Sequence, residues 1–127
     1  MTSQGFEIRF SCGHFYQQRK WSAEKNRQVF GRCFHPQGHG HDYRLLAETS
    51  DPTLALTLEA AMHELRKELD HKHLNFDFPE FRDQVPTSEN LLLFCLDRLQ
   101  KKLGKTAALN LQIWETPEIG ASLQNHS

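Results

Sequence analysis

The stretch CFHPQGHGHDY, residues 33–43, carries the side chains of this chain that are best suited to metal chemistry. His39 and His41 are separated by one glycine, and residues two apart on a β-strand point to the same side. A third histidine, His14, ends an alternating segment that we expect to pair with this strand. Three imidazoles converging from neighbouring strands form an open zinc site, whose fourth position is left to water or substrate. An H-x-H pair alone is equally typical of surface histidines in a turn, and it is the third histidine that favours a metal site.

A cysteine lies close to these histidines. Cys33 precedes His39 by six residues, and a nearby metal ion would favour its thiolate, which is a good base or nucleophile. The spacing leaves two other interpretations open, a fourth metal ligand and an inert loop cysteine. Cys12 and Cys95 instead fall on apolar faces of predicted elements, and we expect both in the core.

Three acidic positions are candidates for proton transfer or ligand binding. Asp70 and His71 form an adjacent carboxylate and imidazole that could pass protons, although a helix C-terminus also favours histidine through its dipole. Glu115 follows an apolar strand face, where a carboxylate needs either solvent or a ligand with N–H donors. Glu89 lies in the first turn of a predicted helix, where the dipole favours an acid for purely structural reasons.

The hydrophobic pattern predicts the elements that position these residues. Four segments alternate as strands, at about residues 5–15, 39–49, 108–116 and 119–123. Two segments show helical spacing, residues 51–70 and 88–103, and the second is capped by Thr87 or Ser88 and ended by Gly104. Residues 17–37 are predicted as a loop. The order strand, strand, helix, helix, strand, strand predicts an α+β fold, an antiparallel four-stranded sheet with two helices on one face.

Composition narrows the class of protein. We expect the 127 residues to form a single domain, residues 1–127. The net charge of −1 argues against a sequence-blind nucleic-acid binder, and no apolar run approaches the roughly 20 residues of a membrane span. The N-terminus lacks the plan of a signal peptide, and the three cysteines show no paired spacing, so we expect reduced thiols in a cytoplasmic protein.

Five motifs occur in a specific order over most of the chain: FSCGH, FGRCFHPQGHGHDY, LDHKHLN, PTSEN and WET. In this order they resemble the 6-pyruvoyl-tetrahydropterin synthases of tetrahydrobiopterin biosynthesis and the related 6-carboxy-tetrahydropterin synthases of the queuosine pathway. The resemblance implies the tunnelling fold, whose subunits assemble into barrels, usually a hexamer of two trimers. The connection TSDPTL departs from the pattern, because the family usually has a longer connection with an extra short strand there.

The resemblance also implies a zinc cofactor, a base, a proton relay and an anchor for the pterin ring. By role, these residues are His14, His39 and His41 for zinc, Cys33, Asp70 and His71 for catalysis, and Glu115, Glu89 and Thr87 for the pterin. The implied substrate is 7,8-dihydroneopterin triphosphate, which loses triphosphate to give a 6-pyruvoyl or a 6-carboxy product. The spacing between Cys33 and His39 does not decide between them. A zinc hydrolase on an unrelated fold and a non-catalytic, zinc-stabilised pterin-binding module are the alternatives.

Overall fold

A computed structural model describes residues 4–14, 20–30, 39–115 and 120–125, with Phe30, His39, Gly40, Gly120 and Asn125 described by their backbone alone. The strands are β1 (Gln4–His14), β2 (His39–Thr49), β3 (Lys72–His73), β4 (Leu109–Trp114) and β5 (Gly120–Asn125). The helices are α1 (Ala23–Phe30), α2 (Ala55–Leu69), α3 (Leu74–Asp77) and α4 (Ser88–Leu103), with short 3₁₀ turns η2 (Pro52–Leu54) and η3 (Pro79–Phe81).

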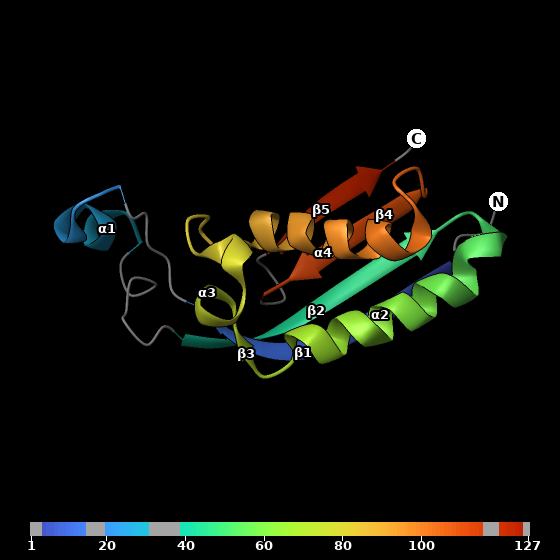
Figure 1. Ribbon diagram of the computed structural model, residues 1–127, viewed down its shortest axis with the longest axis horizontal. Helices are drawn as coiled ribbons and strands as arrows, with labels where there is room; N and C mark the ends of the chain where they lie inside the picture. Colours follow the sequence, from blue (N-terminus) through green and yellow to red (C-terminus); the bar gives the residue numbers. More distant parts are fainter. Residues whose placement is uncertain (1–3, 15–19, 31–38, 116–119, 126–127) are drawn as a thin grey trace.

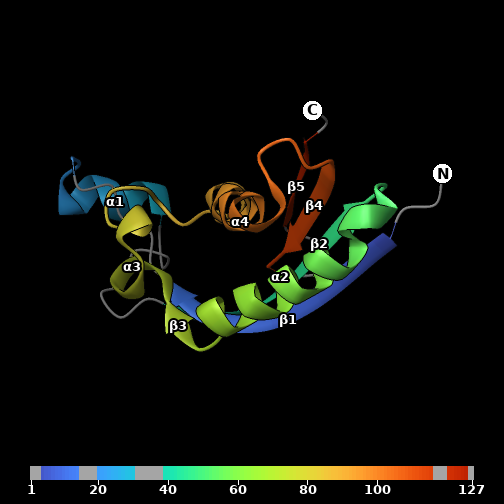
Figure 2. The same cartoon turned by 45° about the vertical axis from the view of Figure 1, so that its right-hand side comes forward.

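The two long helices, α2 and α4, cover one face of the sheet, as Figures 1 and 2 show. Their apolar sides meet the alternating apolar residues of the strands, and Leu58, Leu45 and Cys95 are among the side chains with no exposed surface. None of the described helices covers the opposite face of the sheet (Figure 2). The predicted α+β class, with two helices on one face, is therefore confirmed.

The strands β1 and β2 pair antiparallel over their full length, from Gln4 opposite Thr49 to His14 opposite His39. Alternation places one set of β1 side chains in the core, ending with His14, which is fully buried. In the same register Cys12 lies opposite His41. The predicted pairing thus brings the histidine-bearing ends of the two strands together.

The sheet differs from the predicted antiparallel four-stranded sheet in one strand. Its order is β3-β1-β2-β4-β5, and β3 pairs parallel to β1 through Lys72 opposite Cys12 and His73 opposite Gly13. The sheet is therefore five-stranded and mixed. A strand of two residues has no alternation to detect, which is why the sequence pattern did not predict it.

The prediction of a loop over residues 17–37 is wrong for residues 23–30, which form α1 at one end of the molecule (Figure 1). The Ser22 hydroxyl accepts a hydrogen bond from the Lys25 N–H at 3.1 Å, as an N-cap does. The buried side chain of Asn26 donates to the Ser22 carbonyl at 3.0 Å. The serine cap was the sequence signal for this helix.

The unusually direct connection between β2 and α2 is a capped turn. Asp51 donates its N–H to the Thr49 hydroxyl at 3.2 Å, and its carboxylate accepts from the Thr53 N–H at 2.9 Å. Pro52 opens the 3₁₀ turn that leads into α2. At the other long helix, Thr87 is the N-cap, as predicted, and Gly104 at φ 103° ends the helix.

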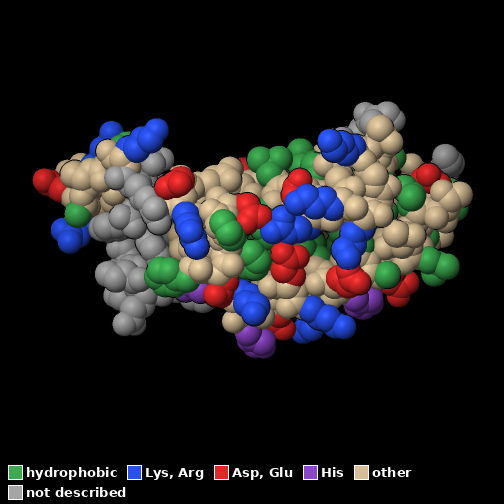
Figure 3. All heavy atoms as spheres, in the orientation of Figure 1, with side chains coloured by type: hydrophobic (Ala, Val, Ile, Leu, Met, Phe, Trp, Pro, Cys, Tyr) green, Lys and Arg blue, Asp and Glu red, His purple; other side chains and the backbone are tan. Residues whose placement is uncertain are grey.

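Charges of both signs are interspersed over the face of the molecule shown in Figure 3. Arg98 is typical, since it contacts Glu68 at 2.9 Å and Glu80 at 2.6 Å and lies over the ring of Phe94. Within the described residues, no helix combines the length and the apolar character that crossing a membrane requires.

Burial on α2 gives a direct test of this packing. Leu58 is 0 % exposed and Leu56, two residues earlier on the same helix, is 82 % exposed. Leu58→Ala should lower the free energy of unfolding by about 2–5 kcal/mol, because it removes buried surface and leaves a cavity. Leu56→Ala, the matched control, should change it by about 0.5 kcal/mol or less. Urea denaturation measures both values, and equal losses would contradict the orientation of α2.

Candidate metal and proton-transfer site

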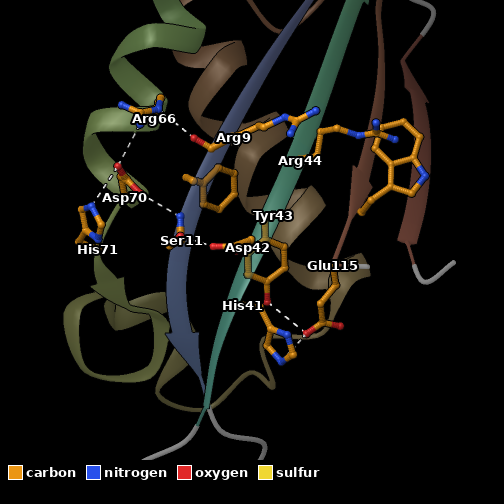
Figure 4. Close-up of a pocket in the computed structure, with 12 residues that line it drawn as sticks. Arg9, Ser11, His41, Asp42, Tyr43, Arg44, Arg66, Asp70, His71 and Glu115 are labelled. Atoms are coloured by element: carbon orange, nitrogen blue, oxygen red, sulfur yellow. Dashed lines mark hydrogen bonds and ion pairs between the residues drawn. The ribbon is translucent and has the colours of Figure 1, made fainter. Parts of the chain in front are cut away.

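A cavity of about 770 Å³ opens where β1, β2, β4 and the end of α2 meet. Figure 4 shows Asp70 and His71 on one side of β1, and His41 with Glu115 beyond β2. Its described lining also carries three arginines and three carboxylates, namely Arg9, Arg44 and Arg66 with Asp42, Asp70 and Glu115. The cavity therefore combines imidazoles and carboxylates with cationic groups.

Within the described residues, two histidines and one carboxylate form a compact cluster of possible metal ligands. Glu115 Oε1 lies 3.5 Å from His14 Nε2 and 3.2 Å from His41 Nε2. The two imidazole rings stack with their centroids 4.8 Å apart. The side chains of His14, His41 and Glu115 are 0 %, 23 % and 12 % exposed, so the cluster is largely withdrawn from water. These three residues are the described group whose ligand atoms all lie within 4.8 Å of one another.

Two of the three distances between these atoms, those from Glu115 to the two imidazoles, match the spacing of zinc ligands. A tetrahedral zinc with bonds of about 2.0–2.1 Å holds its ligand atoms about 3.3 Å apart. The two measured distances, 3.2 and 3.5 Å, lie on either side of that value. Imidazole nitrogen and carboxylate oxygen are also ordinary ligands of divalent transition metals. His39 lies opposite His14 in the strand register, but its side chain is outside the described part of the structure.

A buried tyrosine forms hydrogen bonds to two members of the cluster. Tyr43, which is 2 % exposed, shares a hydrogen bond of 2.8 Å with His14 Nδ1, and its hydroxyl donates to Glu115 Oε1 at 3.4 Å. With a proton on Nδ1, His14 donates to the tyrosine oxygen and turns the lone pair of Nε2 toward the cluster. Tyr43 was not among the predicted site residues, although it follows His41 on the same strand face.

The Asp70–His71 pair lies at the edge of β1. Asp70 Oδ1 accepts from the Ser11 N–H at 2.9 Å, and the His71 N–H donates to the Ser11 carbonyl at 2.6 Å. Asp70 Oδ2 is 3.5 Å from His71 Nε2. The Ser11 N–H is the main cause of the lowered pKa of Asp70, and the charges of His71 and Arg66 contribute to it. Asp70 is therefore a carboxylate even at a pH where an ordinary aspartate is protonated.

His71 has an unusual backbone conformation. Its φ of 62° lies in the left-handed region, and it is the non-glycine residue with positive φ in the described chain. Its side chain is 83 % exposed. This conformation allows the chain to turn from α2 into β3 while Asp70 and His71 both remain hydrogen-bonded to the backbone of Ser11.

The other predicted site residues lie elsewhere or outside the described residues. Cys33 falls in a segment that the structure does not describe. Thr87 caps α4 by accepting from the Asn90 N–H at 3.2 Å, and Glu89 is exposed in the first turn. Neither is among the described residues that line the cavity.

The remaining described cysteines and histidines lie outside the candidate metal cluster. Cys12 and Cys95 are buried in the core, as expected, and burial raises the pKa of Cys12 to about 12, so its thiol stays neutral. His63 is exposed on α2. His73 is half-buried and stacks on Phe76 at 4.3 Å between centroids.

The fold and site together define an α+β protein with a candidate metal cluster at the end of its central strands. The sequence profile of the family described as 6-pyruvoyl tetrahydropterin synthase matches residues 5–126. The chain is 35 % identical over 118 residues to the human protein named 6-pyruvoyl tetrahydrobiopterin synthase, covering 86 % of this chain and 81 % of the human one. The chain therefore belongs to the 6-pyruvoyl tetrahydropterin synthase family.

Two further similarities bear on the fold and on the range of activities. The solved structure of the Caenorhabditis elegans 6-pyruvoyl tetrahydropterin synthase superposes with a TM-score of 0.85 at 26 % identity, covering 97 % of this chain and 94 % of that one. A dihydroneopterin monophosphate aldolase of Pyrococcus furiosus is 36 % identical over 70 residues, which span 54 % of this chain and 57 % of the aldolase. The tunnelling fold predicted from the motifs agrees with the first similarity.

The contribution of the Tyr43 hydroxyl to metal binding can be tested without an activity assay. Tyr43→Phe removes the hydroxyl that contacts His14 and Glu115, and loss of such a supporting hydrogen bond weakens metal affinity about 10–100-fold. Thr49→Val is the matched control, because it removes another buried hydroxyl at the far end of β2. Competition against a chromogenic chelator measures zinc affinity in each variant. Unchanged affinity in Tyr43→Phe, with the fold intact, would contradict the role of the tyrosine.

Proposed function

We propose that this protein is a zinc-dependent tetrahydropterin synthase, which eliminates triphosphate from 7,8-dihydroneopterin triphosphate. The observation that carries the proposal is one cavity lined by His41 and Glu115 of the candidate metal cluster and by the Asp70–His71 pair. His14, the third member of the cluster, is buried and lies 3.5 Å from Glu115. The proposed reaction activates hydroxyl groups and moves protons between carbon and oxygen. Such a reaction requires a metal site beside a proton-transfer pair. Membership of the family and the similarity to the human enzyme support the same reaction class.

His14, His39 and His41 are the proposed zinc ligands. A bound zinc ion would supply Lewis acidity, which lowers the pKa of the hydroxyls on the substrate side chain. The hydrogen bond with Tyr43 would keep the imidazole of His14 in the required tautomer. A non-catalytic, zinc-stabilised module would need the same ligands but would have no use for the Asp70–His71 pair.

Cys33 is the proposed base, and Asp70 with His71 is the proposed relay. The Cys33 thiolate would take a proton from the substrate side chain, and the His71 imidazole would return a proton to it. Asp70 has two tasks, to fix the orientation of His71 and to stabilise its protonated form. Asp70 is suited to both, because the Ser11 N–H keeps it ionised.

Glu115 is the proposed anchor of the pterin ring, helped by Glu89 and Thr87. Its carboxylate would pair with the adjacent N–H donors on the guanidine-like edge of the ring. Because Glu115 contacts both His14 and His41, the ring that it holds would lie beside the proposed zinc ligands.

A homo-oligomer, specifically a hexamer, is part of the proposal, with residues 1–127 as the single domain of each subunit. β5 and the short β3 are the two edges of the described sheet. Such edges are protected when a neighbouring subunit continues the sheet. We propose the 6-pyruvoyl product, because the relatives that match most of the chain, including the human and Caenorhabditis elegans proteins, carry that name.

A second candidate is an aldolase that acts on dihydroneopterin monophosphate, as the name of the Pyrococcus furiosus relative states. Incubation with the triphosphate and, separately, with the monophosphate distinguishes the two. Release of triphosphate with a product of the mass of 6-pyruvoyl-tetrahydropterin supports the synthase. Loss of a carbon fragment as an aldehyde, from either substrate, would overturn the pyruvoyl assignment.

The zinc ligands can be tested through metal content. His41→Ala should bring zinc well below one ion per subunit and abolish turnover, because it removes a ligand from the cluster. His63→Ala is the matched control, since His63 is an exposed histidine on α2. Elemental analysis of the purified variants measures the metal. Equal zinc in both variants would place the ion elsewhere.

A role of Cys33 as a base can be distinguished from a role as a metal ligand. Cys33→Ser should keep its zinc and its thermal midpoint but lose turnover by about 10²–10⁴-fold, the usual contribution of a positioned base. Steady-state kinetics with elemental analysis on the same preparation gives both quantities. Loss of zinc in Cys33→Ser would instead make Cys33 a fourth ligand, and full activity would make it an inert loop residue.

A further inference from the structure

One arginine joins the end of α2 to the edge of β1. Arg66 Nε donates to the Arg9 carbonyl at 2.8 Å, and Arg66 Nη2 lies 3.3 Å from Asp70 Oδ2. Asp70 Oδ1 in turn accepts from the Ser11 N–H at 2.9 Å. The guanidinium, the carboxylate and the β1 backbone between residues 9 and 11 thus form a closed ring of contacts, and Figure 4 shows it beside His71.

The closed ring fixes the direction of the Asp70 carboxylate. Its Oδ1 is held by Ser11, which still allows Oδ2 to move by rotation about that hydrogen bond. Arg66 stops this rotation, because it holds Oδ2 while its own Nε is tied to the carbonyl of Arg9. Oδ2 is also the atom that lies 3.5 Å from His71 Nε2. Ser11 and Arg66 together therefore fix the position of the carboxylate oxygen that the imidazole meets.

His71 has few other contacts that could orient its ring. Its side chain is 83 % exposed, and its described polar contacts are the Asp70 carboxylate and the backbone bond from its own N–H to Ser11. A mobile carboxylate would consequently leave the imidazole mobile. An error of about 1 Å in the placement of a catalytic group can reduce a rate about 10²-fold.

We propose that Arg66 is a positioning residue, which holds Asp70 so that its carboxylate orients His71 for proton transfer. The inference rests on the proposed function of the Asp70–His71 pair as the relay. Arg66 is 49 % exposed, and exposed ion pairs contribute little to stability. Its removal should therefore be visible in turnover and in the imidazole of His71 more than in the stability of the fold.

The kinetic test compares Arg66→Met with Lys67→Met, the next residue on α2, which is also basic and exposed. We expect Arg66→Met to lower kcat about 10–100-fold with little change in KM, zinc content or thermal midpoint. Arg66→Lys should not rescue turnover, because an ammonium group cannot span the carbonyl and the carboxylate as a guanidinium does. An unchanged kcat in Arg66→Met, or an equal loss in Lys67→Met, would overturn the inference.

A double-mutant cycle separates positioning from a structural role at the strand edge. In the background of Asp70→Asn, Arg66→Met should cause no further loss of kcat, since it acts through Asp70. Independent, multiplying losses would mean that Arg66 acts by some other route, and the inference would fail.

A third measurement does not depend on the proposed reaction. The imidazole NMR signal of His71, assigned by its loss in His71→Gln, should shift in Arg66→Met in the same direction as in Asp70→Asn. A signal unmoved by Arg66→Met would overturn the inference even if the enzyme is active. If the wild-type protein turns over no pterin triphosphate, the proposed function fails, and the NMR result still decides whether Arg66 orients the pair.

Discussion

The antiparallel register between β1 and β2 is the constraint on which the whole site depends. Side chains alternate between the faces of a sheet, so a slip of one residue would move His41 from the cluster to the uncovered face. The core resists that slip, because Tyr43 and Phe10 stack with ring centroids 5.3 Å apart and are both nearly fully buried. The packing that stabilises the sheet thereby also fixes the distance between the two imidazoles.

A single strand, β1, serves both halves of the site. One of its faces ends in His14, within the cluster, while the backbone of Ser11 holds Asp70 and His71 along the strand edge. Groups attached to one strand keep their separation when loops move, since a paired strand is stiff. The Asp70–His71 pair and the candidate metal cluster therefore have a fixed relative position even though they lie on opposite sides of β1.

The sequence predicted those parts of the fold and site that follow from local periodicity or from a cap. Alternation placed His14 and His41 on buried faces, and Thr87 and Gly104 marked the ends of α4. It did not predict the partners that tertiary packing creates. Tyr43 meets His14 only through the β1–β2 register, and Glu115 reaches the cluster only through the pairing of β4 with β2.

The left-handed backbone of His71 lowers the stability of the fold, while the side chain of the same residue has a proposed role in the reaction. A non-glycine residue in that region costs about 1–2 kcal/mol, a penalty that glycine avoids. The turn from α2 into β3 would therefore be satisfied at least as well by a residue without a side chain. An engineering scheme that stabilises the protein by replacing such residues with glycine would select this position early. The resulting protein would gain resistance to unfolding and lose the imidazole of the proposed relay, so screens for thermostability alone would enrich variants without that imidazole.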